Sequence, residues 1–354
     1  MICTMMICTM AANEAKWQQM RSSKSLLLFS LVFFFLVGSL NAVFAQSNIS
    51  DPGAKQICAS VKDVPLPAAD LPTAAEQKEL AHCSSADAFY GFGQPVDFVK
   101  ARKCAYDEIA RGDKTVLGGK AILMMIYANG KGVPKNYDVA LNLACTLGDA
   151  PGDAAGRVYE INRLKTGNMV GGNVSICDHS SGRVLYEQCA ILGERFDKIA
   201  RDKKLAELAL SWSERDKKAL HVLWEEVERF SKEQANDAIN LEPTFEVQEE
   251  AALKEHALSM LEQLERGELP QFSTKELLQA EAAEKAAYDR TQHGTVSKWG
   301  TVTSDSVKKS EEEWLRYCDA WLTFGKQRYP KVSQESWKTW LDQERAYMLN
   351  KLLH

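Results

Sequence analysis

The sequence predicts an all-α protein in which a short helical-repeat domain (an α/α solenoid) precedes an antiparallel helical bundle. Helical spacing of apolar residues dominates from about Ala74 to the end, and no convincing run of alternating residues indicates a strand. One motif returns after 39 residues, which is typical of stacked helix pairs. The composition is that of a folded chain, because 45% of the 354 residues are hydrophobic and 26% are charged.

The charge balance and the motif content reduce the number of function classes to consider. The chain has 43 lysines and arginines against 48 aspartates and glutamates, so its formal net charge is -5 and no basic footprint supports nucleic-acid binding. The sequence contains no phosphate loop, dinucleotide fingerprint or metal-ligand motif. We therefore expect no cofactor, no metal and no nucleic-acid partner.

Residues 20–45 have the form of a cleaved signal peptide. A basic start at Arg21 and Lys24 precedes an apolar run, and the sequence VFA then places small residues before a cut at Gln46. The apolar run is shorter than the roughly 20 residues of a bilayer span, so cleavage is favoured over a membrane anchor. We expect residues 1–19, which contain MICTM twice in tandem, to be an upstream start extension.

The 309 residues from Gln46 onward carry a net charge of -7, since the part before them has a net charge of +2. An acidic exported chain is not drawn to anionic membranes. We expect a periplasmic or secreted location, with no membrane association after cleavage.

Seven cysteines remain in the expected mature chain, and an exported protein pairs an even number of them. Cys177 and Cys189 lie on either side of a turn-rich DHSSG stretch that lets the chain fold back. No C-x-x-C occurs, and neither His82 nor His179 completes a zinc ligand set, so disulfides are favoured over a metal cluster. The expected pairs are Cys177 with Cys189, Cys104 with Cys145 and Cys58 with Cys83, which leaves Cys318 as the free thiol.

Residues 46–84 are rich in proline, alanine and aspartate and predict an extended lead-in. Residues 85–167 contain the internal repeat, in which Asp97 aligns with Asn136 and a partial third copy begins at Ala154. A period near 40 residues with helix–turn–helix content indicates a solenoid, whose neighbouring helix pairs bury each other's apolar faces.

The repeat motif begins at Tyr127 and has a physical rationale. Gly130 and Gly132 supply turn conformations that other residues avoid, and Val133 can insert into the core beneath the turn. Ala140 stays small where two helices cross closely. This stretch, YANGKGVPKNYDVAL, resembles the Sel-one-like α/α repeats, which are relatives of tetratricopeptide repeats. The resemblance implies a concave face that binds a protein or peptide.

The remainder of the chain predicts a linker and a helical bundle. Residues 168–182 are rich in glycine, serine and asparagine, as expected of a linker between domains. Residues 183–354 carry apolar stripes at helical spacing and predict an antiparallel bundle of about four helices. We expect a connecting loop at 290–305 and a last helix that starts near Ser333.

The bundle segment resembles the LprI-type lysozyme inhibitor family of exported bacterial proteins. The similar stretches are YEQCAILGERFDKI after Cys177, RDKKLAELALSW, and EEEWLRYCDAW followed by DQERAYMLNKL. Within them Trp314, Tyr317, Asp319 and Arg345 match the family motif, whereas Cys318 stands where the family has arginine. The resemblance implies an exported helical protein, with lysozyme as a candidate target.

Two groups in the bundle allow both a functional and a structural interpretation. Four tryptophans could form an aromatic platform for sugars, but at helical spacing they are more often bundle core, which we expect here. They are Trp314, Trp321, Trp337 and Trp340. Asp319 with Arg345 is either a buried ion pair that orients the helices or a solvated pair, and the sequence leaves both open.

Two candidates for catalysis are rejected. His179, Ser180 and Ser181 are adjacent, and three adjacent residues cannot build a catalytic triad, so we expect a turn there. Neighbouring glutamates in a helix point about 100° apart, which is the wrong geometry for an acid–base pair across a substrate. These glutamates are Glu225 with Glu226 and Glu249 with Glu250.

These observations favour an exported, non-catalytic protein-binding protein of the bacterial envelope, with lysozyme or an envelope protein as its partner. An acidic surface would attract a basic lysozyme in a salt-dependent manner. The first alternative is a repeat-based periplasmic adaptor. A cell-wall-acting enzyme is less favoured, because the sequence offers no acidic pair placed in a cleft.

Overall fold

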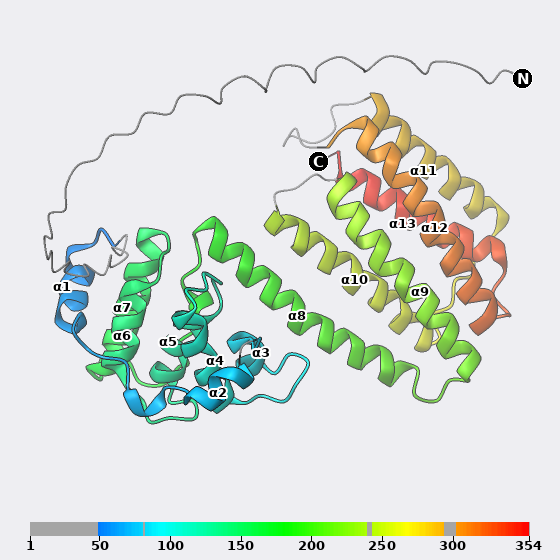
Figure 1. Cartoon of the computed structure of the whole chain (residues 1–354). Coiled ribbons are helices and arrows are strands. Elements are labelled where there is room, and N and C mark those ends of the chain that lie inside the picture. The colour runs from blue at the N-terminus through cyan, green and yellow to red at the C-terminus, as the bar shows by residue number, and fades with distance from the viewer. Residues whose placement is uncertain (1–48, 81, 239–242, 294–301, 354) are drawn as a thin grey trace, which may run out of the picture. The chain divides into compact units, whose positions relative to one another are not determined.

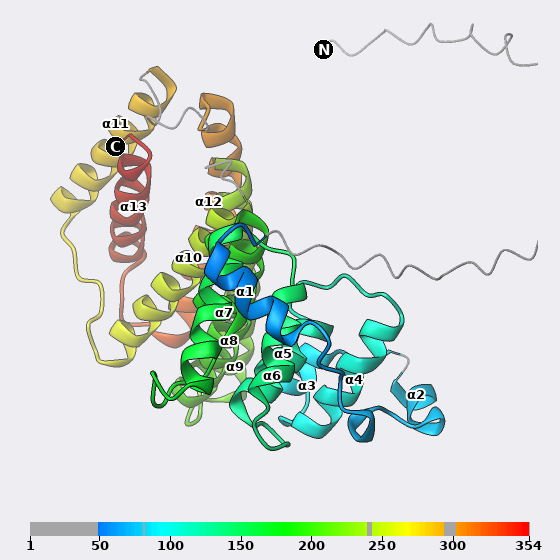
Figure 2. The same cartoon turned by 90° about the vertical axis from the view of Figure 1, so that its left-hand side faces the viewer.

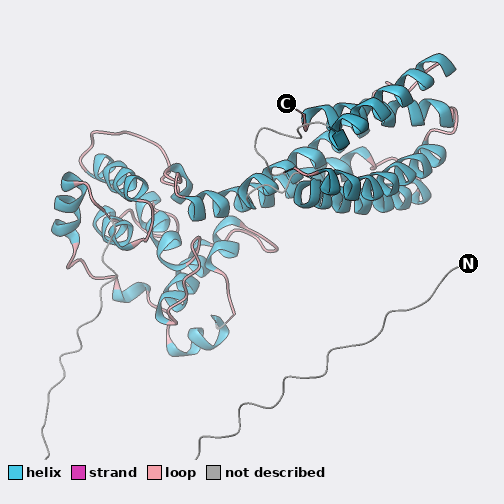
Figure 3. Cartoon of the chain, turned by 90° about the horizontal axis from the view of Figure 1, so that it is seen from above, coloured by secondary structure: helices cyan, strands magenta, loops and turns pink. Residues whose placement is uncertain are grey.

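The structure is a computed structural model that describes residues 49–353 apart from 81, 239–242 and 294–301. Every element in these segments is helical and none is a strand, which confirms the all-α class (Figure 3). The predicted upstream extension and signal peptide lie outside the described residues. Among the described residues, no helix has both the length and the apolar character that a membrane span requires.

The helices follow one another as shown in Figure 1. The first group is α1 (Pro52–Val61), α2 (Ala74–Leu80), α3 (Ser85–Tyr90), α4 (Phe98–Ala110), α5 (Gly119–Asn129), α6 (Tyr137–Thr146) and α7 (Pro151–Lys165). The second group is α8 (Arg183–Leu208), α9 (Glu214–Glu233), α10 (Pro243–Glu265), α11 (Thr274–His293), α12 (Ser304–Arg328) and α13 (Gln334–Lys351). Single turns of tighter or wider helix are η1 (Ala68–Asp70), η2 (Ile176–Asp178) and η3 (Gln234–Ala238).

The lead-in at 46–84 is not extended throughout, as the sequence predicted, because it contains α1 and α2. Asp51 caps α1 by accepting a hydrogen bond from the backbone N–H of Ala54 at 2.8 Å, and Pro52 occupies the first turn. Ala54 and Val61 are buried against the rest of the chain. The helix-start signal Asp51-Pro52 was missed because the sequence that follows α1 is rich in proline.

The predicted 39-residue repeat is confirmed by matching backbone geometry. Asp97 caps α4 and Asn136 caps α6, each through a side-chain oxygen that accepts from a backbone N–H three residues ahead. The N–H of Asp97 donates to Ala88 at 2.9 Å, and the N–H of Asn136 donates to Tyr127 at 2.9 Å. Both donors and both acceptors are 39 residues apart, so the two helix–turn–helix units have the same turn.

The turn glycines hold this geometry. Gly91 and Gly130 end α3 and α5 at φ values of 79° and 69°, and Gly93 and Gly132 follow at 67° and 68°. Residues with a Cβ rarely adopt this left-handed region. At Gly132 a Cβ would also lie 3.1 Å from Cβ of Phe98, because the second turn packs on the first residue of α4.

The first hydrophobic core joins α1 and the repeat helices to the start of α8. Helix α5 is almost entirely buried and contacts α3, α4 and α6. Tyr127 and Ala140 are buried in this core, and Val133 packs against it from the turn. The predicted repeat-motif residues therefore hold helix pairs together.

Three disulfides staple the first core, and two of the predicted pairings are wrong. Cys177 pairs with Cys189 as expected, and Cys318 is the free cysteine among the described residues. The other bonds are Cys58–Cys145 and Cys83–Cys104, not Cys104–Cys145 and Cys58–Cys83. The physical reason is that α1 packs against α6 and α7, which brings Cys58 within a Cα–Cα distance of 5.7 Å of Cys145.

The predicted linker at 168–182 is packed against the first core. Val174 and Ile176 are buried in the core. The side chain of Asn129 exchanges two hydrogen bonds of 2.8 Å with the backbone of Val174, and the disulfide at Cys177 ties the segment to α8. The chain passes from the first core to the second within α8 and not in the predicted linker.

The second core is formed by residues of α8, α9, α10, α12 and α13, and α11 packs beside it against α13. The described part of the bundle thus has six helices where the sequence predicted about four. Gln327 of α12 donates to Asp216 of α9 at 2.9 Å, and Arg229 of α9 pairs with Glu313 of α12, so these neighbours are antiparallel as expected. The apolar stripe at Leu253, Ala257, Leu261 and Leu264 lies in α10 as expected, whereas no stripe predicted α11. Helix α11 escaped detection because its buried positions are mostly alanines, which make a weak apolar stripe.

Helices α11 and α13 run side by side in the same direction (Figure 2). The backbone N–H of Phe272, just before α11, donates to Ser336 at 3.1 Å, and Arg290 donates to Asn350 at 2.6 Å near the other ends. Ser333 caps α13 as predicted. Of the expected loop at 290–305, residues 294–301 lie outside the described residues, while 290–293 belong to α11 and 304–305 to α12.

Stacked aromatic side chains fill the second core. Trp314, Trp321 and Trp337 are each at most 2% exposed, and Trp340 is partly buried beside Trp321 and Trp337. A Cβ on Gly325 would lie 2.4 Å from the indole of Trp337, so α12 and α13 touch closely there. The core interpretation of the tryptophans is confirmed.

We predict that Gly132→Ala destabilises the protein by about 1–2 kcal/mol, because it combines a left-handed backbone with a close contact to Phe98. The matched control is Gly152→Ala in α7, where a Cβ meets nothing within 4 Å. That change should leave stability equal or higher by up to about 1 kcal/mol. Urea denaturation followed by circular dichroism measures both, and equal losses would contradict the turn assignment.

Candidate functional site

Helix α8 has an apolar face that extends beyond the first core. Leu185, Leu192, Phe196 and Ile199 follow one another at helical spacing, so they share one face. Leu185 and Leu192 are buried in the first core, whereas Phe196 is 43% and Ile199 is 51% exposed. The two exposed side chains form an apolar surface that we call the α8 patch.

Aromatic and charged neighbours border the α8 patch. The Phe196 ring lies 4.9 Å from the ring of Phe92 and 5.7 Å from that of Tyr90 in the first repeat unit. Arg195 stacks over Phe92 at 3.8 Å and bonds to Asp87 at 2.6 Å. These contacts hold Phe196 in place, so the patch is a formed surface next to the first turn of the repeat.

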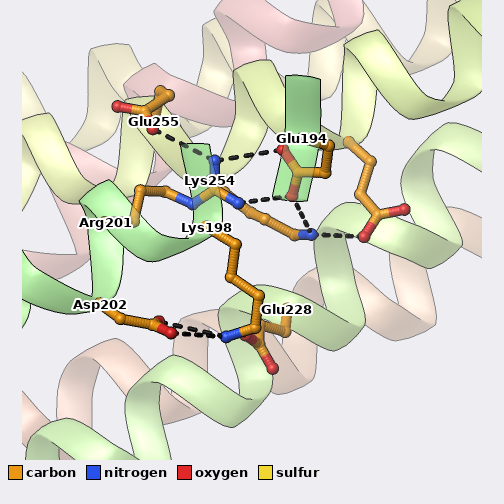
Figure 4. A network of polar contacts seen from close by, with 8 residues as sticks. Glu194, Lys198, Arg201, Asp202, Glu228, Lys254 and Glu255 are labelled. Atoms are coloured by element: carbon orange, nitrogen blue, oxygen red, sulfur yellow. Dashed lines mark hydrogen bonds and ion pairs between the residues drawn. The ribbon is translucent and has the colours of Figure 1, made fainter. Parts of the chain in front are cut away.

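A different face of α8 binds the second core through ion pairs (Figure 4). Arg201 is 2% exposed, pairs with Glu194 and bonds to Glu255 of α10 at 3.2 Å. Lys254 of α10 bonds to Glu194 at 3.1 Å. Burial disfavours the charge of Arg201, but the two glutamates outweigh burial and raise its pKa, so the guanidinium stays charged.

A second, more exposed set of charges lies on α8 in the same view. Lys198 bonds to Asp202 at 2.9 Å and approaches Glu228 of α9 at 3.8 Å (Figure 4). The two sets together place α8 against both α9 and α10. All of these charges have protein partners, and we assign them a structural role.

Arg345 anchors the family-motif residues of the bundle, but not through Asp319. Arg345 is completely buried, bonds to Ser310 at 2.8 Å and to Glu311 at 2.9 Å, and lies 5.3 Å over the Trp314 ring. The expected pair is absent from the described contacts because Asp319 is exposed on another face of α12. Of the motif residues, the structure brings together Trp314, Tyr317 and Arg345.

Helices α11 and α13 meet at a carboxyl pair. Burial, and then the charges of Asp342 and Glu311, raise the pKa of Glu284 to about 7, while Lys338 opposes this shift. Asp342 is itself 7% exposed and bonds to Lys338 at 2.7 Å. Near neutral pH the carboxyl group of Glu284 is therefore partly protonated where α11 meets α13.

Cys318 lies near this pair without the properties of a nucleophile. Burial, followed by the charges of Glu284 and Asp342, raises the pKa of its thiol far above the usual value. The thiolate is therefore not available at physiological pH. Cys318 is part of the bundle packing.

The rejected catalytic candidates have structural partners. His179 bonds to Glu160 at 3.1 Å, Ser180 donates to the backbone of Cys177 at 2.9 Å, and Ser181 donates to Asp153 at 2.5 Å. Each side chain has a different partner, as expected of a turn. Among the paired glutamates, Glu225, Glu226 and Glu250 each bond to a basic residue of their own helix.

Two open pockets occur in the bundle, and the described residues include no cluster of side chains that could hold a metal ion. One pocket of about 280 Å³ lies between α8 and α9 over Leu205 and Trp224. The other, of about 480 Å³, lies between the turn after α10 and Trp340. Glu284 lines neither of these two pockets.

Sequence analysis missed the α8 patch, although a signal was available. The stripe that begins at Leu185 continues into RFDKIA, and its last apolar members have no partner stripe within the repeat.

No family model matches this chain, and no curated protein or solved structure is significantly similar to it.

We predict that Arg345→Met costs about 3 kcal/mol of stability, because it leaves Glu311 without its partner inside the bundle. The control is Asp319→Asn on the exposed side of α12, which should change stability by less than about 0.5 kcal/mol. Thermal denaturation of both variants measures this. A large loss of stability for Asp319→Asn would contradict the structure, because it would show that Asp319 has a stabilising partner.

We predict that Glu284 makes the protein less stable as pH rises. Its pKa is about 7 in the folded chain and 4.5 as a model value, so its contribution is full below pH 4.5 and is lost as pH rises through 7. Glu284→Gln should therefore have the wild-type Tm near pH 5 and a higher Tm at pH 8.

Asp289→Asn is the matched control for this measurement. Asp289 is an exposed carboxylate on the same helix, bonded to Lys285 at 2.9 Å. This variant should keep the wild-type dependence on pH between 5 and 8. Identical pH profiles for the wild type and Glu284→Gln would rule out the raised pKa of Glu284.

Proposed function

We propose that this chain is an exported, non-catalytic protein-binding protein of the bacterial envelope, and that lysozyme is its candidate target. The observation that carries the proposal is the α8 patch. Phe196 and Ile199 continue a core face into solvent, and apolar surface of this kind is typical of protein interaction sites.

The net charge of the chain favours a basic partner. Asp197 and Asp202 are exposed on the same helix, and the expected mature chain has a net charge of -7. Arg195 and Lys198 beside the patch are basic, so the attraction to a cationic protein surface comes from the net charge of the whole chain, which would speed association at low salt. The resemblance to LprI-type inhibitors and to Sel-one-like repeats supports the same class of function.

Export is supported by the redox state of the cysteines. Six of the seven cysteines after Gln46 form disulfides. Such bonds persist in oxidising compartments and are rare in the cytosol. Together with the leader sequence, they favour a periplasmic or secreted protein.

We predict that residues 46–354 inhibit lysozyme with 1:1 stoichiometry at low salt and more weakly at moderate salt. Ile199→Glu should weaken inhibition at least tenfold, because it places a charge in the α8 patch. Leu315→Glu is the matched control, since Leu315 is 67% exposed on α12 and outside the patch. A lysozyme activity assay with each variant measures the effect.

Full lysozyme activity at micromolar wild-type protein would overturn lysozyme as the target. Equal loss for the two variants would show that the patch is not the contact surface. In the first case the repeat-based adaptor becomes the better proposal, and capture of partners from an envelope extract tests it.

A further inference from the structure

Residues 62–73 cross the first core as a strap that is closed by a disulfide at each end. Cys58 binds Cys145 of α6 on one side, and Cys83 binds Cys104 of α4 on the other. Between them, the side-chain amide of Asn142 donates to the backbone of Val61 at 2.9 Å. The strap therefore lies across the second helices of both repeat units.

The strap contacts the core through isolated side chains. Val64 and Leu66 pack against the first core and Pro72 is buried, whereas Pro65 and Leu71 between them are exposed. The pattern is that of a peptide segment bound in a groove, in which some side chains enter the core and the others face solvent, and the turn η1 (Ala68–Asp70) lies within it.

Asp70 is the polar anchor of the strap. Its carboxylate accepts a hydrogen bond from Tyr127 at 2.7 Å, and Tyr106 lies 2.6 Å from Tyr127. Burial, and then the bonds to Tyr106 and Asp70, raise the pKa of Tyr127, so its phenol stays protonated and donates. Arg102 completes the cluster at 3.4 Å from Asp70.

Asp70 does not use all the hydrogen-bond donors of this cluster. Arg102 is 8% exposed and donates to the backbone of Gly132 at 2.9 Å, but its Nε has no hydrogen-bond partner among the described residues. A guanidinium of this kind can bind both oxygens of a carboxylate at once. Asp70 makes a single, long contact with Arg102, so a better-placed carboxylate could gain a bond.

The second repeat unit packs without such a polar cluster. At the 39-residue offset, Leu141 corresponds to Arg102 and Cys145 corresponds to Tyr106. Leu141 is completely buried, so the second unit packs with an apolar residue at this position. The polar residues occur only where the strap delivers a carboxylate.

We propose that Arg102, Tyr106 and Tyr127 form a carboxylate-recognition site for a peptide segment that carries an aspartate among proline and alanine residues. In this chain the strap fills the site. The inference goes beyond the proposed function, because it concerns a second site that the chain's own strap occupies and names the chemistry of the segment that fits it.

The test uses the expected mature chain with residues 64–72 replaced by a glycine–serine sequence of equal length, which keeps both disulfides and empties the groove. The probe is a labelled peptide of residues 64–73, VPLPAADLPT, measured by fluorescence anisotropy. A second peptide carries asparagine in place of the aspartate. We expect no binding to the wild type, because its site is occupied, and sub-millimolar binding of the aspartate peptide to the replaced chain.

The asparagine peptide should bind at least tenfold more weakly, and Arg102→Leu in the replaced chain should remove this difference. Leucine is the residue that the second unit uses there, so this variant should fold. Equal binding of the two peptides, or no binding to the folded replaced chain, would overturn the proposal. Failure of the replaced chain to fold would also overturn it, because a replaceable occupant cannot be essential to the core. Lysozyme inhibition by the wild type tests the proposed function separately, since its strap stays closed.

Discussion

The architecture depends on α8, a helix of 26 residues that contributes to both hydrophobic cores. One face buries Leu185 and Leu192 in the first core, and another buries Leu205 in the second, beyond the ion pairs of Arg201. A helix cannot turn the same face to two cores that lie on different sides of it. The first face must therefore emerge into solvent, and this constraint exposes Phe196 and Ile199.

Local rules predicted much of the fold. The repeat offset of 39 residues, the turn glycines and the cap at Ser333 all depend on contacts within a few residues, and the structure confirms them. The pairings of Cys58 and Cys104 were wrong because they depend on which helices pack together, and that is set by long-range contacts. The helices missed were α1, masked by nearby prolines, and α11, whose alanines give little periodic signal.

The candidate sites were harder to predict than the fold, for a physical reason. Arg345 was expected with Asp319 because both belong to one motif, but the crossing of α12 and α13 brings Glu311 to it. Asp70 and Arg102 are 32 positions apart, and nothing in their local sequence indicates that they meet. Buried polar groups find their partners through tertiary packing, so only the structure reveals these clusters.

Hydrogen exchange of the wild-type chain, with and without lysozyme, tests most directly whether the exposed face of α8 is a contact surface. The backbone of 195–200 lies where every side chain is exposed, so its amides should exchange faster than those around Leu185. Bound lysozyme should slow exchange across 195–200 and at the neighbouring first turn near Phe92. Slowing confined to α11 to α13, with no change along α8, would contradict the account.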